Sequence, residues 1–138
     1  LKRSENEKVH PNKYCVPGGK LEWNNLPVGK PTRLNGDVLD FENSVEDLLL
    51  REVKEEAGIE IEPNLKYVNS VAFIRPDGLP VILVNFAAKY KSGEIQLEKG
   101  SFTDHVWVNR EEIKNYPCIL GVKEEIAQTI KLFNPNNS

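Results

Sequence analysis

A chain of 138 residues with 39% hydrophobic content is about the size of one domain, and we expect a single domain over residues 1–138. Its formal net charge of −3 argues against a broad basic surface, so no nucleic-acid polymer is expected as a partner. The longest apolar runs, such as "VILV" at 81–84, are far shorter than the roughly 20 residues of a membrane-spanning helix, so no membrane partner is expected either.

The two cysteines, Cys15 and Cys118, are far apart and form no CxxC pair. They therefore predict free thiols in a reducing compartment, not a disulfide framework or a metal knuckle. The N-terminal stretch "LKRSENEKVH" has no apolar segment of the signal-peptide type. We take the cytoplasm as the expected location.

In the first third of the chain, "KYCV" followed by "PGGK" predicts a short strand that ends in a tight turn, and "LEW" is compatible with a resumed strand. The stretch "NNLPVGKPTRLNGD" is rich in Pro, Gly and Asn and predicts a long loop. Ser44 is the expected N-cap of a helix over residues 45–57, which should end at Gly58.

The remaining elements alternate strands with helices, and this order predicts an α/β sandwich or an α+β layer fold. They are two strands at 65–74 and 80–90 joined by the turn "RPDGL", a strand "DHVWVN" at 104–109, a short helix "REEIKNY" at 110–116 and an amphipathic helix at 121–133.

The helix at 45–57 carries an unusual acidic stripe. Glu52, Glu55 and Glu56 are three and four residues apart, and this spacing places their like charges side by side on the helix surface. Leu48 and Leu49 project along or beside the same stripe, so the acids do not form an ordinary solvated face. A divalent cation such as Mg²⁺ or Mn²⁺ prefers carboxylate oxygens and would offset the repulsion.

The segments "PGGK" and "REVKEEAGI" resemble the Nudix box of the Nudix hydrolase family. The second half of the pattern, R-E-U-x-E-E-x-G-U with U aliphatic, is matched at every fixed position: Arg51, Glu52, Val53, Glu55, Glu56, Gly58 and Ile59. The resemblance covers nearly all of the chain and implies an α/β/α sandwich with a mixed central sheet. We expect the family's first strand to be truncated here to "LKRS".

The first half of the box departs from the family pattern. Gly19 lies 32 positions before Arg51, whereas the pattern calls for 14, so about 18 residues are inserted, at about 24–41. A rival alignment starts at Gly36, six residues before Glu42, but leaves one residue too many before Arg51. We prefer Gly19, because a Pro-Gly-Gly turn that ends a strand resembles the family.

With Gly19 as the box glycine, Asn43 stands where the first box glutamate belongs, and Glu42 is its neighbour. In the family that glutamate resembles a group that pairs with the box arginine and so holds the adjacent metal ligands. We expect Glu42 to take this part and to lie within hydrogen-bonding distance of Arg51.

The resemblance implies that water attacks a phosphorus atom in the pyrophosphate bridge of a nucleoside diphosphate-linked substrate. We expect Glu52, Glu55 and Arg51 to act in catalysis, while the identity of the general base stays open. Carboxylates can hold a pyrophosphate only through metal ions that bridge them to phosphate oxygens. The expected metal ligands for Mg²⁺ (or Mn²⁺) are Glu52, Glu55, Glu56, the Gly18 carbonyl and Glu98.

Two further choices concern residues outside the box helix. Glu98 is preferred over Asp104 as the later acid, because Asp104 heads an expected strand and could be capping or pairing there. Three cations, Lys20, Lys30 and Arg33, are candidates to bind an anionic substrate. For Lys20 an ordinary exposed lysine is an equally good interpretation, and the insert at 24–41 is almost as well explained as a tolerated surface excursion.

Two function classes follow. The first is a metal-dependent pyrophosphohydrolase that acts on a small nucleotide, with nucleoside triphosphates, ADP-ribose and other nucleotide sugars all open as substrates. The alternative is a non-catalytic Nudix-like module that binds a nucleotide as a sensor or regulator. The three retained helix glutamates favour the enzyme, whereas the displaced first glutamate keeps the alternative open. A homodimer is left open as the assembly.

Overall fold

The computed structural model describes residues 1–135. The elements in chain order are β1 (Lys2–Arg3), the 3-10 helix η1 (Trp23–Asn25), β2 (Arg33–Asn35), β3 (Val38–Asp40), α1 (Ser44–Ala57), β4 (Glu60–Ile61), β5 (Lys66–Ile74), β6 (Pro80–Ala87), β7 (Tyr90–Ser92), β8 (Phe102–Asp104), the 3-10 helix η2 (Glu112–Asn115) and α2 (Val122–Phe133).

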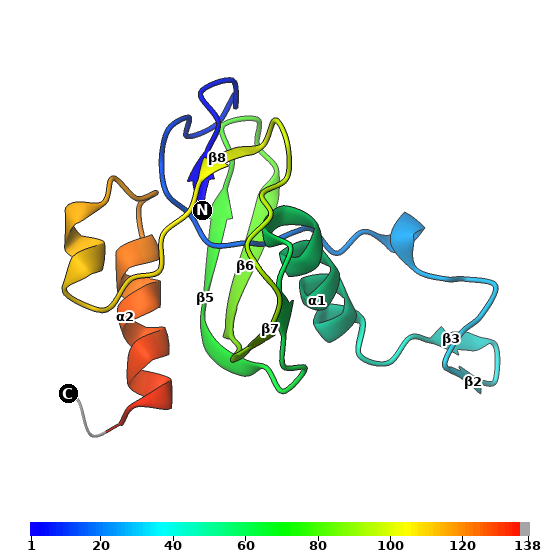
Figure 1. The fold of residues 1–138 in the computed structure, drawn as a ribbon. Coiled ribbons are helices and arrows are strands. Elements are labelled where there is room, and N and C mark those ends of the chain that lie inside the picture. Colours follow the sequence, from blue (N-terminus) through cyan, green and yellow to red (C-terminus); the bar gives the residue numbers. More distant parts are fainter. Residues whose placement is uncertain (136–138) are drawn as a thin grey trace.

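The helices lie on two sides of the strands. In Figure 1 the long β5–β6 hairpin stands in the middle, with α2 on one side and α1 on the other. The side-chain amide of Asn69 on β5 donates a hydrogen bond to Gln128 of α2 at 2.6 Å, and the Lys66 ammonium lies 4.8 Å from the centre of the Phe133 ring. The expected α/β sandwich is thereby confirmed.

The strands pair as antiparallel ladders, β1 with β8, β2 with β3, β4 with β7, and β5 with β6. Parallel pairing enters through Tyr14, which bridges Lys2 in the antiparallel sense and Cys118 in the parallel sense. Within residues 1–135 the strands thus form four two-stranded antiparallel sheets in place of the expected mixed central sheet, and the parallel pairing is an isolated bridge beside β1.

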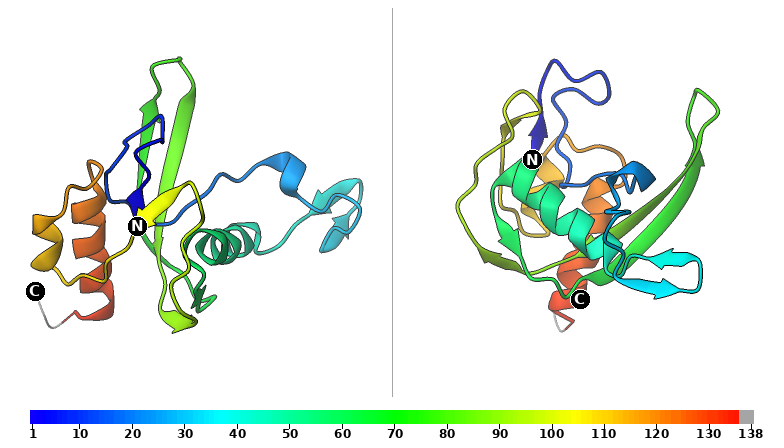
Figure 2. Two further views of the ribbon diagram at one scale, coloured as in Figure 1. Left: turned by 45° about the horizontal axis from the view of Figure 1, so that its top comes forward. Right: turned by 90° about the vertical axis from the view of Figure 1, so that its right-hand side faces the viewer.

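The tightly buried core is small, and its residues come from α1, β6, β8, η2, the start of α2 and the segments beside β1 and β4. Its apolar members are Tyr14, Leu48, Ala57, Ile59, Ala87, Phe102, Ile113 and Val122. The far end of the β5–β6 hairpin projects beyond this core, as Figure 2 shows, and Ile74 and Ile82 there are about three-quarters exposed. No helix within residues 1–135 is long and apolar enough to cross a bilayer. The homodimer stays a prediction.

The central helix forms where the sequence predicts it. α1 ends at Ala57, and Gly58 follows in the left-handed region with φ of 76°, which glycine adopts without strain. The expected N-cap is wrong, because Asn43 occupies that position with φ of 58° and Ser44 is already helical. The Ser44 hydroxyl instead donates to the carbonyl of Phe41 at 2.7 Å.

Three expected strands do not form. Only Asp104 of the segment 104–109 belongs to a strand, and "LEW" gives way to η1 at Trp23. The expected strand "KYCV" is reduced to isolated bridges at Tyr14. The inserted stretch contains a hairpin instead of a plain loop: Asn35 pairs with Val38 across a two-residue turn that begins with Gly36. Gly36 has φ of 61°, which such tight hairpin turns require at their first position.

Candidate active site

The acidic stripe of α1 runs along the covered side of the helix. Leu48, Glu52 and Glu56 follow one another at intervals of four, so they lie on one helical row. Leu48 is buried, the Glu52 side chain is only 20% exposed, and Glu56 is half-buried. Glu55 sits at the edge of this row with its side chain 56% exposed. Two of the three box glutamates are therefore held against other parts of the chain.

The segment Gly18–Gly19 lies directly over these two carboxylates. The Gly18 amide donates a hydrogen bond to Oε2 of Glu56 at 3.0 Å. A Cβ added to Gly19 would come within 2.4 Å of both Cδ and Oε1 of Glu52, so any other residue at position 19 would displace the Glu52 side chain. The preference for Gly19 as the box glycine thus has a physical basis, because its backbone lies against the first of the three box glutamates. The Gly18 amide faces the site. Metal binding by the Gly18 carbonyl stays a prediction.

The loop that contains Glu98 caps the C-terminal end of α1. Free carbonyls at a helix end need donors, and here the amides of Gln96 and Glu98 donate to the carbonyls of Ala57 (2.9 Å) and Glu56 (3.1 Å). Gly58 makes room for this loop, since a Cβ on it would meet Gln96 at 2.8 Å. These backbone contacts bring Glu98 beside the acidic row.

The other candidate acid is engaged elsewhere. Asp104 accepts a hydrogen bond from the Tyr14 hydroxyl at 2.7 Å and a second from the amide of His105 at 2.8 Å. The two hydrogen bonds hold the pKa of Asp104 below its ordinary value. Asp104 therefore pairs with the N-terminal part of the sheet, and Glu98 is the acid that lies near the box helix.

The electrostatics of the acidic row centre on Glu56. Burial raises the pKa of Glu56 to about 7, and the charges of Glu52 and Glu98 act in the same direction. The Gly18 amide and the positive charge of Arg3 oppose the rise, but they do not cancel it. A half-buried carboxylate with two acidic neighbours is stabilised by a proton or by a bound cation.

The box arginine lies among the helix acids. Nη2 of Arg51 is 3.7 Å from Oε1 of Glu52, and its Nε is 3.9 Å from Oε1 of Glu55. These distances are longer than a hydrogen bond, so the contacts are loose ion pairs. Arg51 therefore adjoins both acids expected to act in catalysis.

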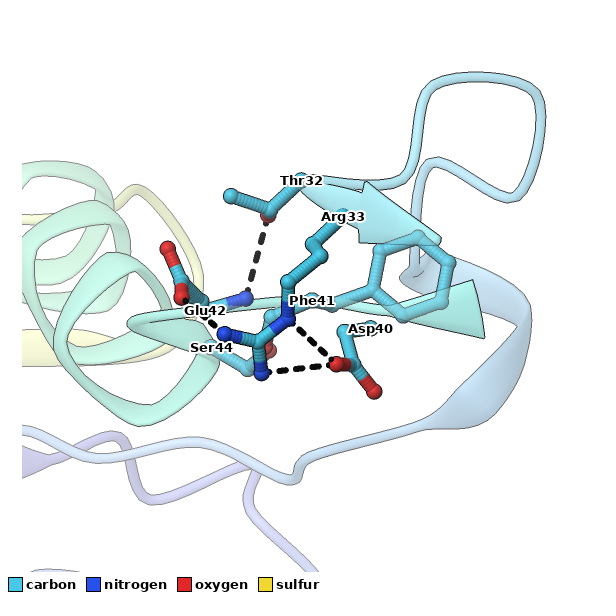
Figure 3. Close-up of polar contacts among 6 residues, drawn as sticks. All are labelled: Thr32, Arg33, Asp40, Phe41, Glu42 and Ser44. Atoms are coloured by element: carbon cyan, nitrogen blue, oxygen red, sulfur yellow. Dashed lines mark hydrogen bonds and ion pairs between the residues drawn. The ribbon is translucent and has the colours of Figure 1, made fainter. Parts of the chain in front are cut away.

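The expected pair of Glu42 with Arg51 is wrong. Oε1 of Glu42 lies 3.5 Å from Nη1 of Arg33. The backbone amide of Glu42 donates a hydrogen bond to the Thr32 hydroxyl at 3.1 Å (Figure 3). The left-handed backbone at Asn43 separates Glu42 from the first helical turn. The Glu42 side chain consequently turns toward the inserted hairpin and pairs with Arg33, a contact that the sequence pattern does not predict.

The three cations expected to bind substrate, Lys20, Lys30 and Arg33, lie in different surroundings. Nε and Nη2 of Arg33 both lie 2.8 Å from Oδ2 of Asp40, so its guanidinium is largely used within the hairpin (Figure 3). This geometry favours a structural part for Arg33 over the expected contact with substrate. Lys20 directly follows Gly19 and so begins beside Glu52, whereas Lys30 lies in a turn in which its amide donates to Pro27. Substrate contacts of both lysines stay predictions.

The residues present suit a divalent cation by their chemistry. Glu52, Glu56 and Glu98 offer hard carboxylate oxygens, and burial together with the charges of the other two raises the pKa of Glu56. Within residues 1–135, however, no three acidic, histidine or cysteine side chains converge closely enough to enclose an ion. Binding would need small side-chain movements, for which the exposed Glu55 and the loosely paired Arg51 leave room.

Comparison with known proteins places the chain in a family. The family model described as "NUDIX domain" matches residues 1–130. In solved structures, the chain is similar to a MutT NUDIX hydrolase from Burkholderia pseudomallei, with a TM-score of 0.66 and 21% identity over 93% of this chain and 84% of that one. At this identity the likeness concerns the fold alone.

Among curated proteins the chain is similar to NAD-capped RNA hydrolases called NudC. It is 34% identical over 75 residues to the protein of Pseudomonas putida strain W619, covering 54% of this chain and 26% of that protein. It is 36% identical over 84 residues to the protein of Mannheimia succiniciproducens, covering 61% of this chain and 30% of that protein. The matched part thus spans less than a third of these relatives.

Proposed function

The chain belongs to the NUDIX domain family, and from this premise we propose that it hydrolyses a pyrophosphate bond in a nucleoside diphosphate-linked substrate with the help of Mg²⁺ or Mn²⁺. The observation that carries the proposal is the half-buried Glu56 under the Gly18–Gly19 segment, with Glu52 and Glu98 as its charged neighbours. Burying carboxylates together costs free energy unless a cation or a proton offsets the charge.

The residues of the acidic row and Arg51 have separate roles in the proposed reaction. Glu52, Glu56 and Glu98 would hold the metal, which when bound neutralises phosphate charge and lowers the pKa of water. Burial raises the pKa of Glu56 to about 7 in the metal-free protein, so a proton competes with the metal for this carboxylate near neutral pH. Arg51, loosely paired with Glu52 and Glu55, keeps these two carboxylates oriented.

The substrate class that we propose is a small nucleotide with a pyrophosphate bridge. The curated relatives are called NAD-capped RNA hydrolases, and NAD itself is a dinucleotide whose two nucleosides are joined through pyrophosphate. ADP-ribose and other nucleotide sugars share the bridge, and nucleoside triphosphates offer related bonds. The net charge of −3 gives no support to a long polynucleotide as the preferred substrate, and we keep the cytoplasm as the proposed location.

A second candidate function is a nucleotide-binding module without turnover. The observation that favours it is the position of Arg51 between Glu52 and Glu55, where Glu42 does not draw the guanidinium away. A guanidinium that competes for these oxygens would weaken metal binding and so slow the chemistry. The retained acids still favour the enzyme.

One experiment separates the two candidates. The protein is incubated with Mg²⁺ and, separately, with NAD, ADP-ribose, a nucleotide sugar and a nucleoside triphosphate, and the products are resolved by chromatography. A hydrolase releases phosphorylated fragments at an initial rate that rises with Mg²⁺. A binding module raises the melting temperature with a nucleotide but releases nothing.

A further inference from the structure

A cavity of about 130 Å³ lies between the inserted stretch and the N-terminal half of α1. The insert contributes Asn25, Leu26 and Phe41 to one wall, and α1 contributes Leu48 and Arg51 to the other. The cavity therefore exists because the insert folds back toward the helix. It occupies the place at which this chain interrupts the family's spacing.

The hairpin wall of the cavity is held by polar contacts. The amide of Glu42 donates to the Thr32 hydroxyl at 3.1 Å, and Arg33 joins Asp40 to Glu42 across the hairpin (Figure 3). The Ser44 hydroxyl donates to the backbone just before it, which ties the hairpin exit to the first turn of α1. The wall is thus an ordered part of the chain.

The cavity adjoins the acidic row directly. Lys20 lines the cavity, and the residue before it, Gly19, is packed against Glu52. Arg51 lines the cavity as well and lies beside Glu52 on the helix. A substrate whose phosphates are held at Glu52 and Glu56 can therefore extend one end into the cavity.

The lining indicates what that end must be. Apolar residues make up much of it, and Asn25, Thr32 and Ser44 add hydrogen-bonding groups. Its charged members are two cations, Lys20 and Arg51, against three carboxylates, which are Glu22, Glu42 and Asp47. This balance disfavours a further phosphate but accepts a neutral or cationic ring. The volume is well below the roughly 300 Å³ of the smallest usual ligand pockets, so the cavity suits one ring and not a whole nucleotide.

We propose that this cavity is a specificity pocket that binds a planar nucleobase-type ring, uncharged or cationic, at one end of the pyrophosphate substrate. The inference rests on the proposed function for the phosphate site, and it adds that a ring of the substrate binds in this cavity. Leu26 and Phe41 supply apolar contacts from the insert, and Asn25 supplies a donor and an acceptor.

The test measures equilibrium binding by calorimetry in the presence of Mg²⁺, at 4 °C to limit turnover. The probes are NAD, which carries two rings, and inorganic pyrophosphate, which carries none. Phe41→Ala and Leu26→Ala should each weaken NAD binding about tenfold, as expected for a lost apolar contact, and leave pyrophosphate binding unchanged. Leu34→Ala is the matched control, because Leu34 is an exposed residue of the same hairpin that does not line the cavity.

Three results would overturn the proposal: no NAD binding to the wild-type protein, NAD binding by both lining variants at wild-type strength, or equal weakening of both probes. Melting curves identify a variant that fails to fold, and the second lining variant then decides. Hydrolysis is assayed separately. Ring-dependent binding without any hydrolysis supports the pocket and defeats the proposed enzyme, whereas hydrolysis without ring dependence does the reverse.

Discussion

The backbone of Gly19 touches the side chain of Glu52 so closely that a Cβ on Gly19 would lie 2.4 Å from the Glu52 carboxyl carbon. Gly18, its neighbour, has open space at the same position. The two glycines therefore form a matched pair, in which one substitution must displace an acid of the proposed site and the other need not.

Gly19→Ala is expected to lower kcat/KM about a hundredfold, since moving a catalytic group by about 1 Å has an effect of this size. Gly18→Ala should stay within about threefold of the wild type, because its amide can still donate to Glu56. Initial rates of the two variants with the best substrate test this. Equal effects of the two substitutions would contradict the importance of the Gly19 contact.

Removing one acid of the row should have different effects along the helix. Glu52→Gln and Glu56→Gln are expected to lower turnover by at least about a hundredfold, because each removes a charged metal ligand from the half-buried row. Glu55→Gln should also lower turnover, but less, since Glu55 is exposed and pairs loosely with Arg51. Circular dichroism checks that the fold is intact. Full activity of the Glu56 variant would argue against the site.

The metal-free protein should lose stability as the pH rises. The pKa of Glu56 is raised in the folded protein from 4.5 to about 7, so the folded state holds its proton more tightly than the unfolded state does. The contribution of this proton to the free energy of unfolding is complete below about pH 4.5 and is lost as the pH rises through about 7. Melting temperatures in a chelator between pH 5 and pH 8 measure this loss.

A substitution isolates the contribution of Glu56. In Glu56→Gln the uncharged amide removes the titration, so the fall in melting temperature over this pH range should shrink, and the variant should melt higher than the wild type at pH 8. Glu55→Gln is the control and should retain the wild-type slope. An unchanged slope in the Glu56 variant would show that other groups cause the pH dependence.

Glu42 and Arg51 should now behave differently from what the family pattern implies. Glu42 contacts Arg33 in the hairpin, so Glu42→Gln is expected to change the affinity for Mg²⁺ by no more than about twofold. Arg51 adjoins Glu52, so Arg51→Gln should weaken the affinity about tenfold, the usual cost of losing a group that orients a metal ligand. The Mg²⁺ dependence of the rate gives both values. A larger effect of Glu42→Gln would support the expected pair of Glu42 with Arg51.

The sequence predicts the parts of this molecule that depend on local patterns. The period of α1 and the glycine that ends it are local features, and both are confirmed. The β5–β6 hairpin likewise follows from two apolar runs around a turn. The "NG" dipeptide at Asn35 and Gly36 carried a signal for the inserted hairpin, because such pairs favour tight turns between strands.

What the sequence does not predict depends on contacts between distant segments. The capping of α1 by the amides of Gln96 and Glu98 joins residues about forty positions apart, and no local pattern encodes it. The partner of Glu42 depends on the left-handed conformation of Asn43, which turns the chain before the helix. The apolar run at 104–109 resembles a strand, but past Asp104 it has no neighbouring strand to pair with in the described chain.

The measurement that tests the central claim most directly is hydrolysis of NAD in water enriched in ¹⁸O, with Mg²⁺ present and the products weighed by mass spectrometry. We predict nucleoside monophosphates, one of which carries a single ¹⁸O atom on phosphorus, at a rate that excess chelator abolishes and that Glu52→Gln lowers about a hundredfold. ADP-ribose and a nucleoside triphosphate are run in parallel, so that a different substrate choice is still detected. Release of no phosphorylated product from any of the three, in a protein that is folded and binds Mg²⁺, would contradict the account.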